Sequence, residues 1–210
     1  MRVANQGELF GEVIDNDNPE VVIQQDGLVT YWKCFLASPL STFQTLLDTI
    51  PWESHELMMF GKSIPQPRLT AWYGDNEEPY TYSGLTLQPH KWTEELLMIK
   101  KRCEEVAGIR FNSMLANLYR DGSDSVSWHS DDEPELGRNP TIASISLGAE
   151  RRFDLRHKET KETVKLNLSS GSLVLMSGEC QHNWIHQIAK TKRVSEPRIN
   201  LTFRVINTPA

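Results

Sequence analysis

The spacing of apolar residues changes once along this chain, near Phe111, and the change indicates the fold class. Upstream of this point, apolar residues recur at helical intervals in two segments. Downstream, apolar and polar residues alternate, as they do on strands with one buried face. Faces of this kind carry Leu115, Asn117 and Tyr119, and then Val164, Leu166 and Leu168. Helices followed by many short strands predict an α+β domain whose β part is a sandwich or barrel, with the helices packed on its outside.

The two helical segments have recognisable ends. The first is expected from Ser38 to Ile50, with Ser38 as its N-cap and Pro51 directly after it. Its apolar face would carry Leu40, Phe43, Leu47 and Ile50. The second is expected to follow Thr93 as N-cap and to end at Gly108. Its apolar stripe would consist of Trp92, Leu96, Ile99, Cys103 and Val106.

Length and composition limit the domain organisation. The 210 residues suffice for one substantial domain, expected over residues 28–210 after a polar, turn-rich, loosely ordered arm of residues 1–27. All apolar runs are far shorter than the ~20 residues of a bilayer span, and the N-terminus lacks a signal-peptide pattern. The three cysteines are far apart and suit a reducing compartment. We therefore expect an intracellular monomer without a membrane partner, cytoplasmic in a bacterium or nuclear in a eukaryote.

The net charge of −6 argues against broad, charge-driven binding of nucleic acid, which depends on neutralising phosphates. Local basic clusters are present, and each is expected to be a solvated turn or helix face. They are Lys100, Lys101 and Arg102, then Arg151 and Arg152, and finally Lys190, Lys192 and Arg193.

Two polar residues near the middle of the chain could bind a metal ion. His129 and Asp131 are two residues apart, so on a strand their side chains leave the same face. Two imidazoles and one carboxylate are the protein ligands of a non-haem Fe(II) oxygenase site, which keeps open positions for co-substrate and dioxygen. His182 and His186 are both candidates for the second imidazole. A His-x-Asp pair on a solvated turn is the simpler alternative.

The last strand favours the metal-site interpretation. One face carries Ile199, Leu201, Phe203 and Val205, and the other carries Arg198, Asn200, Thr202 and Arg204. The alternative is an ordinary strand with its polar face in water. The two arginines lie about 20 Å apart along the backbone, so their long side chains could hold opposite ends of a short dicarboxylate. A dicarboxylate beside a metal triad indicates 2-oxoglutarate.

Taken together, these residues closely resemble the AlkB group of Fe(II)/2-oxoglutarate dioxygenases, enzymes that repair alkylated nucleobases. The resemblance runs from about Phe60 to Val205. It is carried by Asn117-x-Tyr119, His129-x-Asp131-Asp132-Glu133, His186 and the segment from Arg198 to Arg204. It implies a double-stranded β-helix, or jelly roll, over residues 111–210, preceded over residues 28–110 by helices and a nucleotide-recognition segment.

The resemblance also implies roles for single residues. His129, Asp131 and His186 would ligate Fe(II), which favours His186 over His182. Tyr119 and Arg198 would bind the distal carboxylate of 2-oxoglutarate. The rest of the co-substrate and the shell around the iron ligands would be held by Asn117, Asn200, Thr202 and Arg204. The expected cofactor is Fe(II), the co-substrates are 2-oxoglutarate and dioxygen, and the products are succinate, carbon dioxide and an aldehyde.

The substrate side of the site is also implied by the resemblance. A base must leave a duplex to reach a recessed metal, and aromatic rings are expected to stack on it. Glu133 would read the exocyclic amino group of adenine or cytosine. The candidate rings are Trp72, Tyr73, Tyr80, Tyr82 and Trp128, of which about half are expected to be core residues only. Ser83 belongs to a segment, Tyr82 to Leu87, that matches the family branch acting on double-stranded DNA.

The segment Met58-Met59-Phe60-Gly61-Lys62 resembles a hairpin of that same branch. There, a phenylalanine before Gly-Lys enters the base stack in place of the flipped base, so Phe60 is predicted to be a wedge. The leading hypothesis is an enzyme that demethylates 1-methyladenine and 3-methylcytosine in single- or double-stranded DNA. Two alternatives stay open: the same chemistry on RNA, and a jelly-roll binding module that has lost catalysis.

Overall fold

The computed structural model describes residues 18–59, 62–75, 80–82 and 85–207. Within these ranges the strands, in chain order, are β1 (Glu20–Ile23), β2 (Leu28–Trp32), β3 (Glu56–Met59), β4 (Lys62–Pro65), β5 (Leu69–Gly74), β6 (Tyr80–Tyr82), β7 (Leu85–Leu87), β8 (Ser113–Tyr119), β9 (Val126–His129), β10 (Ile142–Gly148), β11 (Arg151–His157), β12 (Thr163–Leu168), β13 (Ser172–Ser177), β14 (Trp184–Ile188) and β15 (Arg198–Arg204). The helices are α1 (Pro39–Thr49), α2 (Glu94–Ala107) and α3 (Cys180–Asn183), with a 3₁₀ turn, η1 (Pro134–Leu136).

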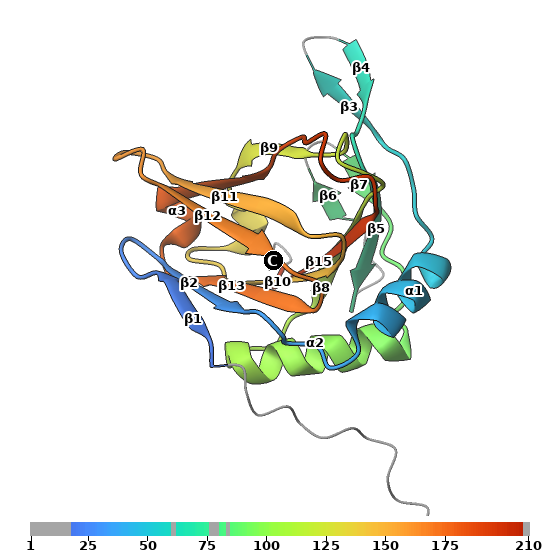
Figure 1. Ribbon diagram of the computed structural model, residues 1–210, viewed down its shortest axis with the longest axis horizontal. Coiled ribbons are helices and arrows are strands. Elements are labelled where there is room, and N and C mark those ends of the chain that lie inside the picture. Colours follow the sequence, from blue (N-terminus) through green and yellow to red (C-terminus); the bar gives the residue numbers. More distant parts are fainter. Residues whose placement is uncertain (1–17, 60–61, 76–79, 83–84, 208–210) are drawn as a thin grey trace, which may run out of the picture.

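Two antiparallel sheets face each other and form the body of the molecule (Figure 1). The larger sheet has the strand order β1-β2-β13-β10-β15-β8-β5, and the smaller has β12-β11-β14-β9. A buried cluster between them takes side chains from both, such as Ile142 and Met176 from the larger sheet and Leu155 and Trp184 from the smaller. The hairpin of β3 and β4 projects away from this body (Figure 1). The predicted α+β class with a jelly-roll core is confirmed.

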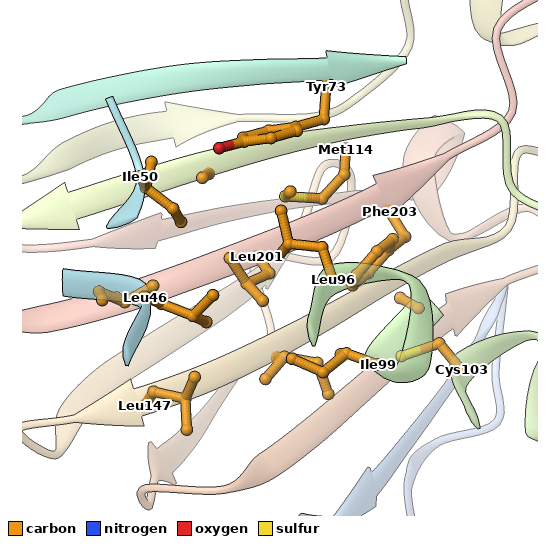
Figure 2. Close-up of a cluster of buried hydrophobic side chains, with 14 of the residues drawn as sticks. Leu46, Ile50, Tyr73, Leu96, Ile99, Cys103, Met114, Leu147, Leu201 and Phe203 are labelled. Carbon is orange, nitrogen blue, oxygen red and sulfur yellow. The ribbon is translucent and has the colours of Figure 1, made fainter. Parts of the chain in front are cut away.

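Helices α1 and α2 lie on the outside of the larger sheet, as predicted (Figure 1). Figure 2 shows the cluster that joins them to it, including Leu46 and Ile50, Leu96 and Ile99 of α2, and Leu147, Leu201 and Phe203 of the sheet. The hydroxyl of Thr93 accepts a hydrogen bond from the backbone N–H of Leu96 at 3.3 Å, and Gly108 takes the left-handed conformation at φ +69°. Both predicted ends of α2 are confirmed. Among the described residues, no helix is both long and apolar enough to cross a membrane.

Some details of the two helices were predicted wrongly. Leu40 is 80% exposed, whereas Leu46 is the fully buried residue of α1, because the face turned to the sheet begins only in the second turn. Ser38 occupies the N-cap position of α1, but its side chain makes no capping hydrogen bond. In α2, Val106 is exposed, because it lies in the last turn beyond the contact with the sheet.

The expected bounds of the jelly-roll core, residues 111–210, are too narrow. Strands β2 and β5 lie upstream of it and belong to the larger sheet, so the N-terminal half of the chain contributes to the core. Strand β1 lies within the predicted loose arm and pairs with β2 over residues 20–23. The ordered chain therefore extends further toward the N-terminus than the polar composition indicated.

Strand β15 places its two faces in different environments, as its alternation predicted. Ile199, Leu201 and Phe203 belong to the cluster beneath the helices. The alternate residues point between the sheets. There the pairing of β15 with β8 sets Arg198 opposite Tyr119 and Asn200 opposite Asn117. This register brings the polar residues of two strands together in one place.

Candidate active site

A cavity lies between the two sheets, and each sheet contributes both polar and apolar side chains to its lining. Its polar residues are Arg68, Asn117, Tyr119, His129, Asp131, Ser144, His186, Arg198, Asn200, Thr202 and Arg204. Its apolar residues are Leu115, Val126, Phe153, Leu168, Met176 and Ile188. Every residue that the sequence assigned to the metal or the co-substrate lies in this one cavity.

His129, Asp131 and His186 come together in the cavity. Each offers a ligand atom, and these three atoms all lie within 4.8 Å of one another. The neighbouring strands β9 and β14 pair His129 directly with His186, and Asp131 follows two residues after the end of β9. His182 lies on α3, is exposed and is not part of the group. The structure therefore selects His186 as the second imidazole near the carboxylate.

The protonation of the group suits a divalent cation. Nδ1 of His129 lies 2.8 Å from the backbone carbonyl of Ser127. A carbonyl can only accept a hydrogen bond, so Nδ1 carries the proton and Nε2 is left as a ligand atom. Burial lowers the pKa of His186 to about 3, with a further contribution from His129, so this imidazole is neutral. Two imidazoles beside a carboxylate form a donor set typical of Fe(II).

Asp131 is held from both sides. Burial opposes its ionisation, but nearby positive charge, chiefly that of Arg204, outweighs burial and lowers its pKa to about 2. Arg204 donates to Oδ2 through Nε at 3.0 Å and Nη2 at 2.7 Å. The backbone N–H of Asp131 donates to the side-chain oxygen of the buried Gln181 at 2.9 Å. The expectation from spacing alone, that both arginines grip a dicarboxylate, is thus modified, because Arg204 is engaged with Asp131.

Arg198 lies at another part of the cavity and is nearly fully buried. Its Nη2 donates to the hydroxyl of Ser146 at 2.9 Å, and its guanidinium carbon lies 5.1 Å from the centre of the Tyr119 ring. Within the described residues, Nε and Nη1 have no hydrogen-bond partner. Burial lowers the pKa of Arg198 to about 10, so it remains charged at neutral pH. A buried cation with two unused donors is a site for an anion.

A hydrogen-bonded chain of polar side chains forms the part of the cavity lining between Asp131 and Arg198. Nδ2 of Asn117 donates to Oδ1 of Asn200 at 3.3 Å, and the Thr202 hydroxyl donates to the same oxygen at 3.0 Å. Asn200 in turn donates to the hydroxyl of Ser144 at 2.8 Å. Arg68 donates from Nε to Oδ1 of Asn117 at 2.8 Å. These side chains are held in one orientation before any ligand arrives.

Four residues that make these contacts were not found by sequence reasoning: Arg68, Ser144, Ser146 and Gln181. Arg68 had a visible signal, since Pro67-Arg68 falls in the part of the chain that resembles the AlkB group, but it was given no role. Gln181 and Ser146 have no sequence signal that sets them apart from other polar residues. Their roles depend on the folded positions of strands far apart in the chain.

The expected substrate residues have mixed outcomes. Trp72 and Tyr73 are buried core residues, so the core interpretation holds for both. Trp128 is partly exposed, does not line the cavity and packs its ring 4.2 Å from the guanidinium carbon of Arg156. It precedes His129 on β9, so the two side chains leave opposite faces of the sheet. Base stacking by Trp128 therefore stays a prediction without support from these contacts.

Glu133 is partly buried near Asp131, and burial raises the pKa of its carboxyl, with Asp131 as a further cause. A charge on a solvated loop would instead be exposed, so the partial burial distinguishes Glu133 from an ordinary acidic surface residue. Phe60 and Ser83 lie outside the described residues, as do the side chains of Tyr80 and Tyr82, whose backbone forms strand β6.

The cavity fits a metal ion and an anionic co-substrate by its own chemistry. Oδ1 of Asp131 is buried and has no hydrogen-bond donor among the described residues, and it lies 3.7 Å from Nε2 of His129. The unused donors of Arg198 face the same cavity. Buried polar atoms are normally satisfied, so these atoms indicate ligands rather than packing.

Comparison with known proteins agrees with this chemistry. Residues 36–204 match the family model described as the 2OG-Fe(II) oxygenase superfamily, where 2OG stands for 2-oxoglutarate. The chain belongs to this superfamily. The superfamily is named for Fe(II) and 2-oxoglutarate, and the His-Asp-His group fits the first of them. The donors of Arg198 fit a carboxylate of the second.

Relatives within the superfamily carry two names. The alpha-ketoglutarate-dependent dioxygenase alkB homolog 3 of Bos taurus is 47% identical over 176 residues, which is 79% of this chain and 61% of that protein. The DNA oxidative demethylase ALKBH2 of Mus musculus is 43% identical over 159 residues, 72% of this chain and 66% of that protein. The expected AlkB resemblance is confirmed. The chain spans about three fifths of the length of the alkB homolog 3 proteins that it matches.

A solved structure supports the fold. The structure titled "The structure of OsALKBH1" superimposes with a TM-score of 0.58, covering 84% of this chain and 96% of the other, at 17% sequence identity. The two-sheet arrangement of this member of the superfamily is therefore shared with a protein of distant sequence.

The two candidate histidines give a matched pair of variants. We expect His186→Ala to weaken binding of Fe(II) more than about 100-fold, since removing a direct ligand costs more than removing a group behind one. His182→Ala should leave the metal affinity unchanged, because His182 is exposed outside the group. Titration of both purified variants with Fe(II) under anaerobic conditions measures the difference. Equal loss of affinity in the two variants would contradict the assignment.

Proposed function

We propose that this protein is an Fe(II)- and 2-oxoglutarate-dependent dioxygenase that removes methyl groups from ring nitrogens of 1-methyladenine and 3-methylcytosine in DNA. The observation that carries the proposal is the placement of His129, Asp131 and His186 in one cavity with the unsatisfied guanidinium of Arg198. The names of the relatives supply the substrate class, since they include a DNA oxidative demethylase.

The three proposed metal ligands differ in the charge that they would bring to Fe(II). His129 and His186 would hold Fe(II) as neutral donors, and Asp131 would supply the single negative charge through the oxygen that Arg204 does not engage. When bound, the metal activates dioxygen at the expense of 2-oxoglutarate. Arg204 and Gln181 keep Asp131 in place, so the carboxylate does not have to reorganise when the metal binds.

The co-substrate would lie between Arg198 and the metal ligands. Arg198 and Tyr119 would bind its distal carboxylate, with Ser146 orienting the guanidinium. Asn117, Asn200 and Thr202 form the wall beside it. Decarboxylation of 2-oxoglutarate takes one oxygen atom of dioxygen into succinate. The other enters a C–H bond of the N-methyl group as a hydroxyl. The N–C bond then breaks, its electron pair stays on the ring nitrogen, the carbon leaves as formaldehyde, and the hydroxyl proton is released to water.

Glu133 would select the base. Its partial burial beside Asp131 keeps the carboxyl close to the cavity, where it can accept a hydrogen bond from an exocyclic amino group. In both 1-methyladenine and 3-methylcytosine, the carbon that carries the exocyclic amino group is next to the methylated ring nitrogen. The two proposed lesions therefore share the group that Glu133 would read. Phe60, Tyr80, Tyr82 and Ser83 are proposed to contact the nucleic acid, and Trp128 is proposed to lie at the edge of the same surface.

We also propose that one dioxygenase domain, expected over residues 28–210 and extended toward the N-terminus by strand β1, acts as a monomer inside the cell. The cell compartment would be the nucleus of a eukaryote or the cytoplasm of a bacterium. Matched DNA and RNA oligonucleotides with one 1-methyladenine test the substrate proposal. With Fe(II), 2-oxoglutarate and dioxygen, mass spectrometry should find loss of the methyl group from the DNA. Turnover of the RNA alone would replace DNA by RNA as the substrate, and absence of succinate would favour a binding module.

Phe60 gives a separate prediction about repair of double-stranded and single-stranded DNA. If Phe60 wedges into a duplex, Phe60→Ala should reduce repair of double-stranded DNA about tenfold while repair of single strands survives, because a single strand needs no base extrusion. The melting temperature should change little. If Phe60 is instead a core residue, truncation should cost about 3–5 kcal/mol of unfolding free energy and lower both activities together. Parallel thermal melting and repair rates on the two substrates distinguish these outcomes.

A further inference from the structure

Two loops beyond the Tyr119 end of β8 are held together as one unit. One is residues 121–125, between β8 and β9, and the other is residues 189–194, between β14 and β15. The backbone N–H of Gly122 donates to the carbonyl of Val194 at 2.8 Å, and that of Thr191 donates to the carbonyl of Gly122 at 2.8 Å. A Cβ atom at Gly122 would lie 2.1 Å from the Thr191 oxygen, so only glycine permits this approach.

A single buried side chain joins both loops from behind. Arg151, the first residue of β11, is only 2% exposed, which corrects the expectation that it is solvated. Its Nη1 donates to the carbonyl of Asp121 at 2.9 Å. Its Nη2 donates to the carbonyls of Asp124 and Ala189, each at 2.9 Å. Three carbonyls from two loops converge on one guanidinium, a geometry that a lysine ammonium on a single stem cannot reproduce.

The same guanidinium lies beside Tyr119, a residue of the proposed co-substrate site. The guanidinium carbon of Arg151 lies 5.7 Å from the centre of the Tyr119 ring, and that of Arg198 lies 5.1 Å from it. Both distances fall within the range of cation–π attraction. Tyr119 and Arg198 line the cavity, whereas Arg151 does not. Arg151 therefore contacts Tyr119, which lines the cavity, without reaching the cavity itself.

We propose that Arg151 is a positioning residue for 2-oxoglutarate: it fixes the Tyr119 ring and the two joined loops so that Tyr119 and Arg198 meet the distal carboxylate in one geometry. The inference rests on the proposed function only for the identity of the co-substrate. An arginine whose role is structural alone would stabilise the loops and leave the affinity of a correctly folded protein for the co-substrate unchanged.

The test measures binding without turnover. Protein loaded with Mn(II) is titrated by calorimetry with N-oxalylglycine, an unreactive analogue of 2-oxoglutarate, in the absence of nucleic acid. We expect Arg151→Met to raise the dissociation constant for N-oxalylglycine about tenfold, which is the size of effect typical of residues that orient a binding group without touching the ligand. Arg151→Lys should raise it less, because lysine keeps the charge but not the fork of donors. Mn(II) affinity should stay within about twofold of wild type, since no metal ligand is altered.

Arg152→Met is the matched control. Arg152 is the next residue on β11, its side chain is 54% exposed, and it pairs with Asp154 at 2.8 Å instead of with the loops. Its substitution should leave N-oxalylglycine binding unchanged.

A second comparison uses Tyr119→Phe, which keeps the ring but removes the hydroxyl. If Arg151 acts through Tyr119, the effect of Arg151→Met should be smaller in the Tyr119→Phe protein than in the wild type.

The outcomes are distinct. Wild-type affinity in folded Arg151→Met, with only a lower melting temperature, would overturn the inference and leave the proposed function standing. Fully additive effects of the Arg151 and Tyr119 substitutions would overturn the route through Tyr119. If Arg151→Met does not fold, Arg151→Lys carries the same comparison. A wild-type protein that binds Mn(II) but no N-oxalylglycine would overturn the proposed co-substrate, and the positioning role with it.

Discussion

Asp131→Ala is expected to abolish turnover and to destabilise the fold in the same step. The turnover rate should fall below about one thousandth of the wild-type rate, because the variant lacks the carboxylate of the proposed His129, Asp131 and His186 metal site. Arg204 would meanwhile lose two hydrogen bonds at a site where both side chains are almost fully buried. Breaking a buried ion pair from one side typically costs about 3–5 kcal/mol. Denaturant unfolding of the metal-free protein measures this cost.

His129→Ala separates the two effects. The His129 side chain is 28% exposed and bonds to the carbonyl of Ser127, so its loss should change the unfolding free energy by less than about 1 kcal/mol. Turnover should fall as far as in Asp131→Ala. Near wild-type demethylation by iron-loaded His129→Ala would contradict the role of His129 as a metal ligand. Wild-type stability of metal-free Asp131→Ala would contradict the stabilising role of the ion pair between Asp131 and Arg204.

Arg198→Met is expected to weaken 2-oxoglutarate binding about 100-fold, which corresponds to two charge-assisted hydrogen bonds of about 1.5 kcal/mol each. The same substitution should leave the metal-free protein as stable as wild type or stabilise it. The hydrogen bond to Ser146 offsets only part of the free-energy cost of desolvating this guanidinium. Its Nε and Nη1 have no hydrogen-bond partner among the described residues. Methionine fills similar space without a charge to desolvate.

Two measurements check the Arg198 prediction. The Michaelis constant for 2-oxoglutarate should rise while that for the oligonucleotide stays near the wild-type value. The melting temperature of the metal-free protein should not fall. An effect on the oligonucleotide alone would reassign Arg198 to contact with nucleic acid. A large loss of stability would show that Arg198 is mainly a structural residue.

The sequence predicted those parts of the site that depend on local spacing. Period-two alternation correctly divided β15 between core and cavity, and the two-residue spacing of His129 and Asp131 brought both to one ion site. The choice between His182 and His186 was not local. It depends on the register of β14 with β9, which turns His186 inward beside His129.

Contacts between distant segments could not be predicted from spacing. The ion pair of Arg204 with Asp131 joins residues 73 positions apart, and the buried contacts of Arg151 come from two loops. Strands β2 and β5 were missed for another reason. Most of their residues are buried on both faces, so their sequences lack the alternation that marks a half-exposed strand.

The central claim is that the cavity couples oxidation of 2-oxoglutarate to removal of a base methyl group. The most direct measurement incubates purified protein with Fe(II), limiting 2-oxoglutarate and an oligonucleotide carrying one 1-methyladenine, and counts succinate and demethylated base by mass spectrometry. We expect one succinate for each methyl group lost, and neither product from His129→Ala. Succinate formation that is unaffected by the methylated base, with the methyl group retained, would contradict it.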